Sequence, residues 1–356
     1  MAIGLFQHRK AVTQAAIAKF SDNKAPNLGL SAFFPTVTTR AKALSIEVQR
    51  NRQLVAVDVQ RCTDPHRNTF SKSTEKIFIP PFYSEMVDFT SCQGYDMSFG
   101  LGVEPNAETA DMLIESAAAE TLALKNMILR AIEKQRASVL QTGTVVLKNG
   151  DSINYNRKAE SMIVKTGTGL WSAVATADPI GDLNTGVEFL RNEGLSAGST
   201  VNAIMGQTAF GYFMLNEKVL KQAAIFNQIR RVDLGMPQFD KVTGMIFQGR
   251  VAAGDYMVNI WTYSDFYENP DGSKTKYVDT NNVVLIPDDF EGKTAFGGVP
   301  AVFNPNTENQ YIAPVQGEFV VHDVIDQIKK AWNLIVESAP LVIPVSVDRL
   351  YTMKVS

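Results

Sequence analysis

The sequence predicts an α+β fold, and three observations support this prediction. Residues 107–141 contain neither proline nor glycine, as expected for one long helix. Between residues 46 and 59, apolar and polar side chains alternate in the manner of a half-buried strand. From Asp178 onward, short helical patterns alternate with strand-like runs. A chain of 356 residues with both kinds of segment is expected to form one or two domains.

Composition excludes several classes of protein. The 34 basic and 37 acidic residues nearly balance, and no uncharged apolar run approaches the roughly 18 residues of a membrane span. The chain reaches His8, Arg9 and Lys10 before the apolar core of a signal peptide could form. Cys62 and Cys92 lie in neither a CxxC nor a zinc-ligand pattern. We therefore expect a soluble globular protein of a reducing compartment.

Positive charge is concentrated at the beginning of the chain. Residues 1–76 contain 12 Lys or Arg and 5 Asp or Glu, a net charge of +7, so the remaining 280 residues carry −10 to reach the total of −3. Such a segment could bind nucleic acid, or it could lie across an acidic face of another subunit. The charges are spread singly rather than grouped with aromatic side chains, which favours the second interpretation and leaves a general affinity for phosphate open. From residue 40 onward they are Arg40, Lys42, Arg50, Arg52, Arg61, Arg67, Lys72 and Lys76.

The segment before the long helix is expected to consist of an arm and a long hairpin. Residues 1–40 combine a short amphipathic stretch with turn-forming residues, which predicts an arm rather than a domain. The strand at 46–59 and a second strand at Ile77–Ile79 are joined by a polar stretch from Arg61 to Lys76. Because the tip of such a hairpin has little apolar surface to bury, we expect its contact partner on another chain.

The helix of residues 107–141 is expected to be a spine that lies on a sheet. At the helical rise it would be about 50 Å long, which few compact domains need. Asn106 is placed to cap its first turn and Gly143 to end it. An apolar stripe recurs at intervals of three or four residues and predicts one buried face. The stripe consists of Leu113, Ala117, Leu124, Ile128, Ala131 and Ile132.

Beyond the spine, the chain predicts a β-ribbon, a mixed region and an extended tail. Asn149-Gly150 between apolar runs is a tight hairpin signal. Helices are expected at 183–191, 208–215 and 216–224, a turn at 269–272 and a strand at 283–286. Residues 332–355 are rich in Val, Ile and Pro and predict extended segments interrupted at Pro340 and Pro344.

No histidine indicates a metal or catalytic site. His8, His66 and His322 are each isolated, without a second ligand at metal-binding spacing. His322-Asp323 could be a general base with its orienting carboxylate, but no nucleophile signature accompanies the pair. We expect surface histidines.

Three other patterns are also better explained by structure than by chemistry. Gly167-Thr168-Gly169 lacks the rest of a phosphate loop and predicts a turn. Asp288-Asp289 with Glu291 lacks calcium-loop spacing. The aromatic run from Tyr256 to Tyr267 could stack on bases, but such side chains in a strand usually pack on neighbouring elements. The sequence thus predicts no catalytic, cofactor-binding or metal-binding residues, which favours a structural role.

The order of these features resembles the lambda-type major head proteins of tailed bacteriophages, a family with the Hong Kong 97-type fold. The resemblance extends from about residue 28 to the end of the chain. Its local matches are Leu30-Ser31-Ala32-Phe33-Phe34, Ile79-Pro80-Pro81, Trp171-Ser172 with Asp178-Pro179 and Asp182, Gly254-Asp255-Tyr256 with Tyr263, Tyr267-Glu268-Asn269, Val283, Leu285 and Pro287 with Gly292 to Gly297, and Glu337-Ser338-Ala339-Pro340-Leu341 with Asp348 and Val355. Several motifs in the family's order carry the resemblance, because no single one is decisive.

The resemblance implies a domain organisation and a function. It implies an N-terminal arm (1–44), an extended loop (45–82), a peripheral domain with spine helix and β-ribbon (83–180), an axial domain (181–300) and return strands (301–356). A major capsid protein of this kind is no enzyme and needs no cofactor. It assembles in the bacterial cytoplasm as hexamers and pentamers into an icosahedral virion shell that encloses double-stranded DNA, with scaffolding, portal and decoration proteins as partners. The inter-subunit contact candidates are Arg50, Arg52, Arg61, Arg67, Lys72 and Lys76.

Several alternatives accompany this prediction. An encapsulin-like cellular compartment would share the fold but enclose enzymes, and an enzyme with a long helix would belong to another class altogether. Residues 1–27 do not align with the family and could be an arm, a scaffold contact or a segment removed during maturation. Some relatives of the fold join a loop lysine to a neighbour's asparagine, for which Lys72 or Lys76 would be the candidates.

Overall fold

The computed structural model describes most of the chain from residue 28 to the C-terminus. The described residues are 28–49, 73–90, 107–147, 150–198, 200–223, 232–240, 244–303 and 311–356. Residues 1–27 of the predicted arm, most of the predicted hairpin loop and the predicted cap Asn106 lie outside them. Among the described residues, helices and strands occur together along the chain, so the α+β prediction is confirmed.

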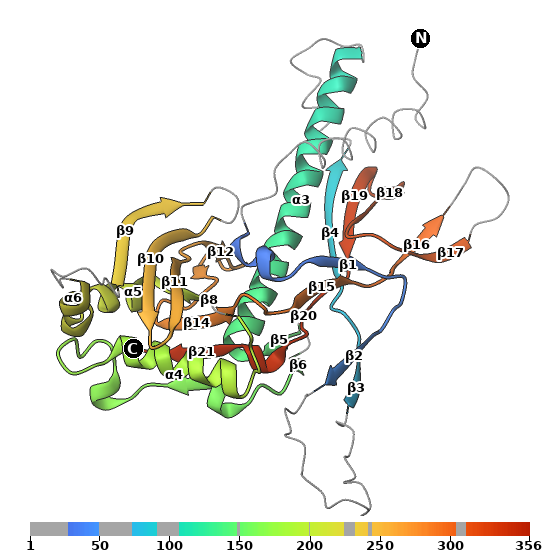
Figure 1. Cartoon of the computed structure of the whole chain (residues 1–356). Helices are drawn as coiled ribbons and strands as arrows, with labels where there is room; N and C mark the ends of the chain where they lie inside the picture. The colour runs from blue at the N-terminus through green and yellow to red at the C-terminus, as the bar shows by residue number, and fades with distance from the viewer. Residues whose placement is uncertain are drawn as a thin grey trace, which may run out of the picture.

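The predicted spine is present as helix α3, Ala107–Thr142. Figure 1 shows it as a long rod that separates a large sheet on one side from a small sheet on the other. The helix packs against β4 (Tyr83–Thr90), β19 (Ala331–Ser338) and β20 (Pro340–Pro344). Within the predicted stripe, Ile128 and Ile132 are almost fully buried, because the stripe faces these strands.

The spine ends at Gly143, as predicted. Gly143 has φ +68°, a conformation that favours glycine, and its N–H donates to the Val139 carbonyl oxygen over 2.9 Å. The chain then forms the predicted ribbon, in which β5 (Thr144–Val146) pairs antiparallel with β6 (Ser152–Asn154). Gly150, at the turn of this ribbon, also has a positive φ of +88°.

Arg157 secures the carboxyl end of the spine. Its guanidinium donates to the Leu140 carbonyl at 2.7 Å, to Thr352 Oγ1 at 3.1 Å and to the Ser161 and Leu350 carbonyls, each at 3.1 Å. Burial lowers the pKa of Arg157 to about 10, and nearby Asp348 raises it. A buried cation therefore satisfies a carbonyl at the end of the helix and ties the helix to the C-terminal strands.

A seven-stranded mixed sheet forms the larger part of the fold. Its strand order is β7-β21-β14-β8-β11-β10-β9. The strands are β7 (Met162–Val164), β8 (Thr200–Met205), β9 (Val232–Phe239), β10 (Ile246–Ala253), β11 (Tyr256–Thr262), β14 (Asn282–Pro287) and β21 (Tyr351–Lys354). The central strand β8 runs parallel to β11 and antiparallel to β14. It is mostly buried because helices cover the sheet.

The covering helices differ slightly from the predicted ranges. They are α4 (Pro179–Asn192), α5 (Gln207–Leu215) and α6 (Glu217–Ala223). Helix α4 begins four residues before the predicted start, because Asp178 caps its first turn and Pro179 fits the first helical position. Together with the sheet, these helices bury a core that includes Trp171, Leu183, Phe213, Val258, Leu285 and Met353.

The tail contributes strands to three different sheets. As predicted, Pro340 and Pro344 bound the extended segments, but the five residues from one proline to the other form a fully buried strand, β20. β19 pairs with β4 and with β18 (Val320–Asp326), β20 pairs with β15 (Gly292–Phe296), and β21 enters the seven-stranded sheet. Because this C-terminal segment adds one strand to each of three sheets, it joins parts of the chain that are distant in sequence.

The segment that leads to the predicted hairpin is well anchored. Residues Gly29–Phe33 form a 3-10 turn, η1, and β1 (Thr36–Thr38) pairs in parallel with β15. β2 (Leu44–Gln49) then pairs antiparallel with β3 (Ser73–Phe78), which confirms the predicted pairing. The second strand begins earlier than predicted, because backbone pairing includes the polar residues Ser73 to Lys76 that the sequence had assigned to the loop.

The remaining strands form two short hairpins. β12 (Phe266–Glu268) pairs with β13 (Lys274–Lys276) across the predicted turn, where the Gly272 N–H donates to the Asn269 carbonyl at 2.9 Å. β16 (Val299–Phe303) pairs with β17 (Tyr311–Val315). Figure 1 shows this second hairpin and the β2–β3 pair projecting from the body in different directions.

Candidate inter-subunit surface

The predicted contact residues lie on the hairpin, and most are outside the described part of the chain. Arg50, Arg52, Arg61, Arg67 and Lys72 belong to the undescribed loop. Lys76 lies in β3 opposite Ile46 of β2, where only its backbone is described. Their contacts therefore stay a prediction, and the described geometry concerns the base of the hairpin.

The base of the hairpin is fixed to the protein core on one side. Leu44 and Phe78 pack against the main core, and the Phe78 ring meets the Tyr155 ring edge-on at 5.9 Å. The Tyr155 hydroxyl donates to the Val342 carbonyl at 2.7 Å, and burial raises the pKa of Tyr155. Next to this anchor, Ile77 is 70% exposed. An exposed apolar side chain beside a fixed strand is typical of a contact surface.

The sheet formed by β4, β19 and β18 has one face on the spine and one face turned away from it. Leu334 packs on Ala117 of the spine, and its strand partners Val87 and Asp323 share that face. The alternate positions form the outer face. They are Ser84, Met86, Asp88, Val320, His322, Val324, Asp326, Asn333, Ile335 and Glu337. These positions include three carboxylates and neither lysine nor arginine, so the outer face is acidic.

Some of these acidic side chains have internal partners and others point outward. Ser84 Oγ donates to Glu337 Oε1 at 3.1 Å, and His322 Nδ1 lies 3.8 Å from Glu337 Oε2. Asp88 is exposed, and so are Met86 and Val324. The outer face therefore offers both apolar area and negative charge to a basic partner.

The sequence carries a further charge signal directly after residues 1–76. Residues 77–124 contain eight Asp or Glu and not one Lys or Arg. This acidic run directly follows the basic hairpin and includes β4 and the first half of α3. Of its described acidic residues only Asp88 lies on the outer face, so the run indicates negative charge near the hairpin but not the face itself.

A second exposed apolar surface lies on the seven-stranded sheet. β9 is the edge strand of this sheet, and most of its side chains are exposed. Met236 is 89% exposed and Phe239 59% exposed. Leu215 and Leu220, from the neighbouring helices α5 and α6, are also exposed. An apolar edge strand with unpaired backbone groups is typical of a surface that meets another chain.

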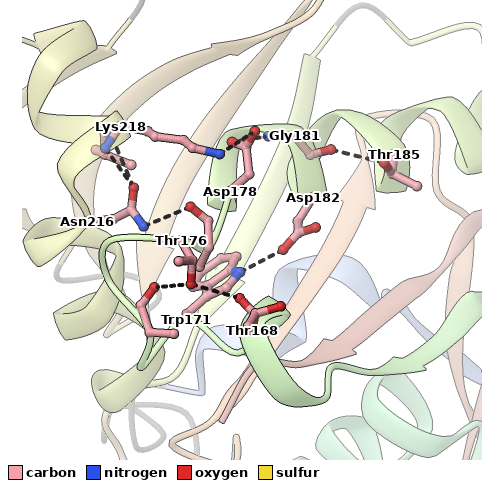
Figure 2. Close-up of polar contacts among 12 residues, drawn as sticks. Thr168, Trp171, Thr176, Asp178, Gly181, Asp182, Thr185, Asn216 and Lys218 are labelled. Atoms are coloured by element: carbon pink, nitrogen blue, oxygen red, sulfur yellow. Dashed lines mark hydrogen bonds and ion pairs between the residues drawn. The ribbon is translucent and has the colours of Figure 1, made fainter.

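The segment around Trp171 is a structural junction at the start of α4. Trp171 Nε1 donates to Asp182 Oδ2 at 2.9 Å, and Lys165 Nζ donates to Asp182 Oδ1 at 2.6 Å. Figure 2 shows Trp171 below α4 with Asp182 pointing toward it, while Lys218 of α6 and Asn216, directly before α6, approach from the other side. Lys218 forms an ion pair with Asp178 at 3.2 Å. These contacts fix α4 and α6 against one loop.

Asn216 is the buried centre of the α6 side of this junction. Its Nδ2 donates to the Val174 and Ala177 carbonyls at 3.0 and 3.2 Å, and its Oδ1 accepts from the Lys218 N–H at 2.9 Å. Since every polar atom of this side chain has a structural partner, the junction holds elements together rather than offering a ligand site.

The sequence patterns that could have indicated chemistry have structural roles. Asp323 accepts from Trp332 Nε1 at 3.0 Å, and Glu337 rather than a nucleophile lies beside His322. Residues Gly167–Gly169 form a 3-10 turn, as predicted. Asp289 accepts from Ser196 Oγ at 2.7 Å and Asp288 from Asn202 Nδ2 at 3.1 Å, so both carboxylates support loops.

Within the described part of the chain, no group of three or more His, Cys, Asp or Glu side chains could hold a metal ion. His8, His66, Cys62 and Cys92 lie outside it. None of the described helices has the length and apolar character needed to span a membrane.

The comparison with known proteins identifies the family. The model of the family described as phage major capsid protein E matches residues 14–355. The chain belongs to this family of phage major capsid proteins. Its fold is the Hong Kong 97-type phage capsid fold, so the predicted resemblance is confirmed. No curated protein matches the chain significantly.

One solved structure supports the same fold for this capsid protein, and two others match more weakly. It is similar to the putative capsid protein of a prophage of Escherichia coli CFT073, with a TM-score of 0.62, 17% identity and coverage of 100% of both chains. It is also similar to a phage-related protein of Bordetella bronchiseptica, with a TM-score of 0.49, 12% identity and coverage of 97% of this chain and 96% of the other. The mature capsid of bacteriophage PhiM1 matches with a TM-score of 0.46, 11% identity and coverage of 93% of this chain and 88% of the other.

Membership of this family has direct consequences. The capsid protein is a structural component of the virion shell and self-associates to form it. The family match favours a phage capsid over the encapsulin-like compartment that the sequence left open.

Proposed function

We propose that the protein assembles as hexamers and pentamers into the icosahedral shell that encloses packaged double-stranded DNA. Assembly takes place in the host cytoplasm with the help of scaffolding, portal and decoration proteins, and the chain has a structural rather than a catalytic role. The family match over residues 14–355 is the observation that carries this proposal. The domain boundaries predicted from the sequence, with arm (1–44), extended loop (45–82), peripheral domain (83–180), axial domain (181–300) and return strands (301–356), belong to it.

Electron microscopy of the purified protein, with its sedimentation profile, tests the proposal. We expect hollow particles, or rings of five and six subunits, when the chain is concentrated or mixed with its scaffold. DNA inside particles isolated from cells would distinguish a phage head from a compartment filled with enzyme cargo. A small oligomer that never assembles under these conditions would contradict the proposal.

The basic hairpin is proposed to contact the acidic outer face of a neighbouring copy. Arg50, Arg52, Arg61, Arg67, Lys72 and Lys76 are the candidates on the hairpin. Asp88 offers the opposite charge on the β4–β19–β18 sheet, beside the exposed side chain of Met86. Single surface ion pairs contribute only about 0 to 1 kcal/mol each, but many identical copies in one shell multiply their effect.

Charge reversal tests this contact. Asp88→Lys is expected to lower assembly yield and to weaken its dependence on salt, because it places a cation opposite the basic hairpin. Glu160→Lys, at another exposed acidic residue on a different surface, is the matched control. Equal assembly of the two variants in sedimentation would refute the contact. Denaturing gels of mature shells test the separate prediction for Lys72 and Lys76, since a covalent link to a neighbour would produce bands larger than one chain.

A further inference from the structure

One turn of the spine carries three buried polar side chains where an apolar stripe would suffice. Glu133 is fully buried, Gln135 is 5% exposed and Arg136 is 4% exposed. Leu129, Ile132 and Leu140, each one turn from a member of this group, are apolar. We call Glu133, Gln135 and Arg136 the α3 clasp.

The first half of the α3 clasp holds the segment that leads into the hairpin. The Leu30 N–H donates to Glu133 Oε1 at 2.8 Å. Arg136 donates to Glu133 Oε2 at 3.1 Å and to Thr294 Oγ1 at 3.1 Å. The Thr294 hydroxyl in turn donates to the Phe34 carbonyl at 3.2 Å. Because Leu30 and Phe34 are themselves fully buried, the incoming segment is fixed by both packing and charge-assisted hydrogen bonds.

The other half holds the strand that leaves the hairpin. Gln135 Nε2 donates to the Tyr83 hydroxyl at 2.9 Å. Tyr83 is the first residue of β4, which follows the end of β3 at Phe78 after four residues. Burial raises the pKa of Tyr83, and the hydrogen bond from Gln135 lowers it. One helical turn therefore contacts both the incoming and the outgoing chain of the hairpin, on different sides of the helix.

The α3 clasp also reaches the seven-stranded sheet. The Tyr263 hydroxyl, at the end of β11, donates to Glu133 Oε1 at 3.0 Å. Tyr263 is 1% exposed, and its ring stacks on Tyr277 at 6.0 Å. Glu133 thus connects the segment that leads into the hairpin with both the spine and the large sheet.

Stability alone gives no reason for this arrangement. Apolar side chains of similar volume often replace a buried ion pair at no cost, because removal of two charges from water is unfavourable. Gln135 Oε1 is buried and has no hydrogen-bond partner in the described part of the chain, a further cost. Hydrogen bonds are directional and apolar contacts are not. The α3 clasp can therefore fix the position of the chain segments that it contacts.

We infer that the α3 clasp positions the roots of the extended hairpin, so that the hairpin points toward the neighbouring subunit during shell assembly. The roots are residues 28–44 and 79–83. This inference rests on the proposed function, since it assigns Glu133, Gln135 and Arg136 a positioning role in the same assembly. The three residues touch no neighbouring subunit in this role and act through the roots.

The test is the double variant Glu133→Leu with Arg136→Met, which keeps volume and removes both charges together. We expect its urea midpoint to stay close to that of the wild type, because release of two buried charges offsets the loss of the acceptor for the Leu30 N–H and the Tyr263 hydroxyl. In hydrogen exchange of the dissociated chain, the amides of Leu30 and of β1 are expected to exchange about tenfold to a hundredfold faster, as loss of a charge-assisted bond implies. β8, which the clasp does not contact, is expected to be unchanged. Assembly yield is expected to fall about tenfold, because a shell multiplies the effect of each weakened contact.

A matched control and a milder variant make the test decisive. Lys165→Met with Asp182→Asn removes an ion pair of the α4 junction and is expected to leave exchange in the roots unchanged. Tyr83→Phe removes only the hydroxyl that accepts from Gln135. If the double variant does not fold, exchange in the roots and assembly yield are measured in Tyr83→Phe instead. Wild-type exchange in the roots with wild-type assembly, in both the Glu133→Leu/Arg136→Met variant and Tyr83→Phe, would overturn the inference. If the wild type itself never forms shells, the proposed function fails, while exchange in the roots still tests the α3 clasp.

Discussion

Replacement of Gly143 by alanine tests how the end of the spine is joined to the C-terminal strands. A Cβ atom at this position would lie 2.5 Å from Cδ and 2.7 Å from Cγ of Arg157. Such distances are far inside van der Waals contact, so the Arg157 side chain would have to move. Four hydrogen bonds hold its guanidinium in place, which makes that movement costly.

Gly150 provides the control for backbone strain. It also has a positive φ, of +88°, but no atom lies within 4 Å of the Cβ that an alanine would add. Gly150→Ala is therefore expected to lower the free energy of unfolding by about 1 kcal/mol, the cost of the left-handed conformation alone. Gly143→Ala has the same cost and in addition breaks about two bonds of the guanidinium, which gives about 3–5 kcal/mol in total.

Urea unfolding of the dissociated chain, followed by tryptophan fluorescence, measures the difference. Trp171 is fully buried and reports unfolding of the large sheet. In the double variant Gly143→Ala with Arg157→Met, the flexible methionine relieves the collision, so its destabilisation is expected to be less than the sum of the two single effects. Equal destabilisation by Gly143→Ala and Gly150→Ala would refute the reasoning. It would show that the collision with Arg157 adds nothing to the cost of the left-handed conformation.

Three further predictions concern Asn216, the carboxyl group of Asp265 shortly after β11, and the exposed β9 edge. Asn216→Ala is expected to lower the free energy of unfolding by about 2–4 kcal/mol, because it removes the α6 cap and leaves buried carbonyls without donors; thermal unfolding checks this, and a change in the melting temperature no larger than that of an exposed variant would contradict it. Burial raises the pKa of Asp265. The folded chain therefore binds the carboxyl proton more tightly than the unfolded chain, in which the pKa is about 3.9. Stability from this group is therefore lost as the pH rises through the raised pKa, and the urea midpoint of Asp265→Asn is expected to gain on the wild type over that interval; a constant difference between the two would be the contrary result. Met236→Lys is expected to leave the urea midpoint unchanged, because the side chain is 89% exposed, and to lower assembly yield in sedimentation if the β9 edge meets another copy; wild-type yield would exclude that edge as a contact.

Much of the local structure could be predicted because it depends on short-range patterns. The run from residue 107 to 141 became α3 almost residue for residue, and Gly143 ends it as the sequence indicated. The ribbon at Gly150 and the turn at Gly272 likewise follow from residues that tolerate a positive φ. The order of these features also sufficed for the resemblance to phage major capsid proteins, which the family match confirmed.

The candidate surface could be predicted only in part. The basic charges of the hairpin are visible in the sequence, but the acidic outer face is formed by alternate residues of β4, β18 and β19 that lie more than 200 residues apart along the chain. Strand pairing decides which of these side chains share a face. The edge position of β9, which exposes Met236, also follows from pairing and not from its own sequence.

The sequence by itself therefore determined the helices, the turns and the family, because each depends on local conformational preference or on the order of motifs along the chain. Only the tertiary structure decided which distant segments meet. The Leu30 N–H reaches Glu133 across 103 residues, and Arg157 reaches Thr352 across 195. Such contacts depend on how sheets and helices fit together after the intervening chain has closed, and no local periodicity encodes that fit.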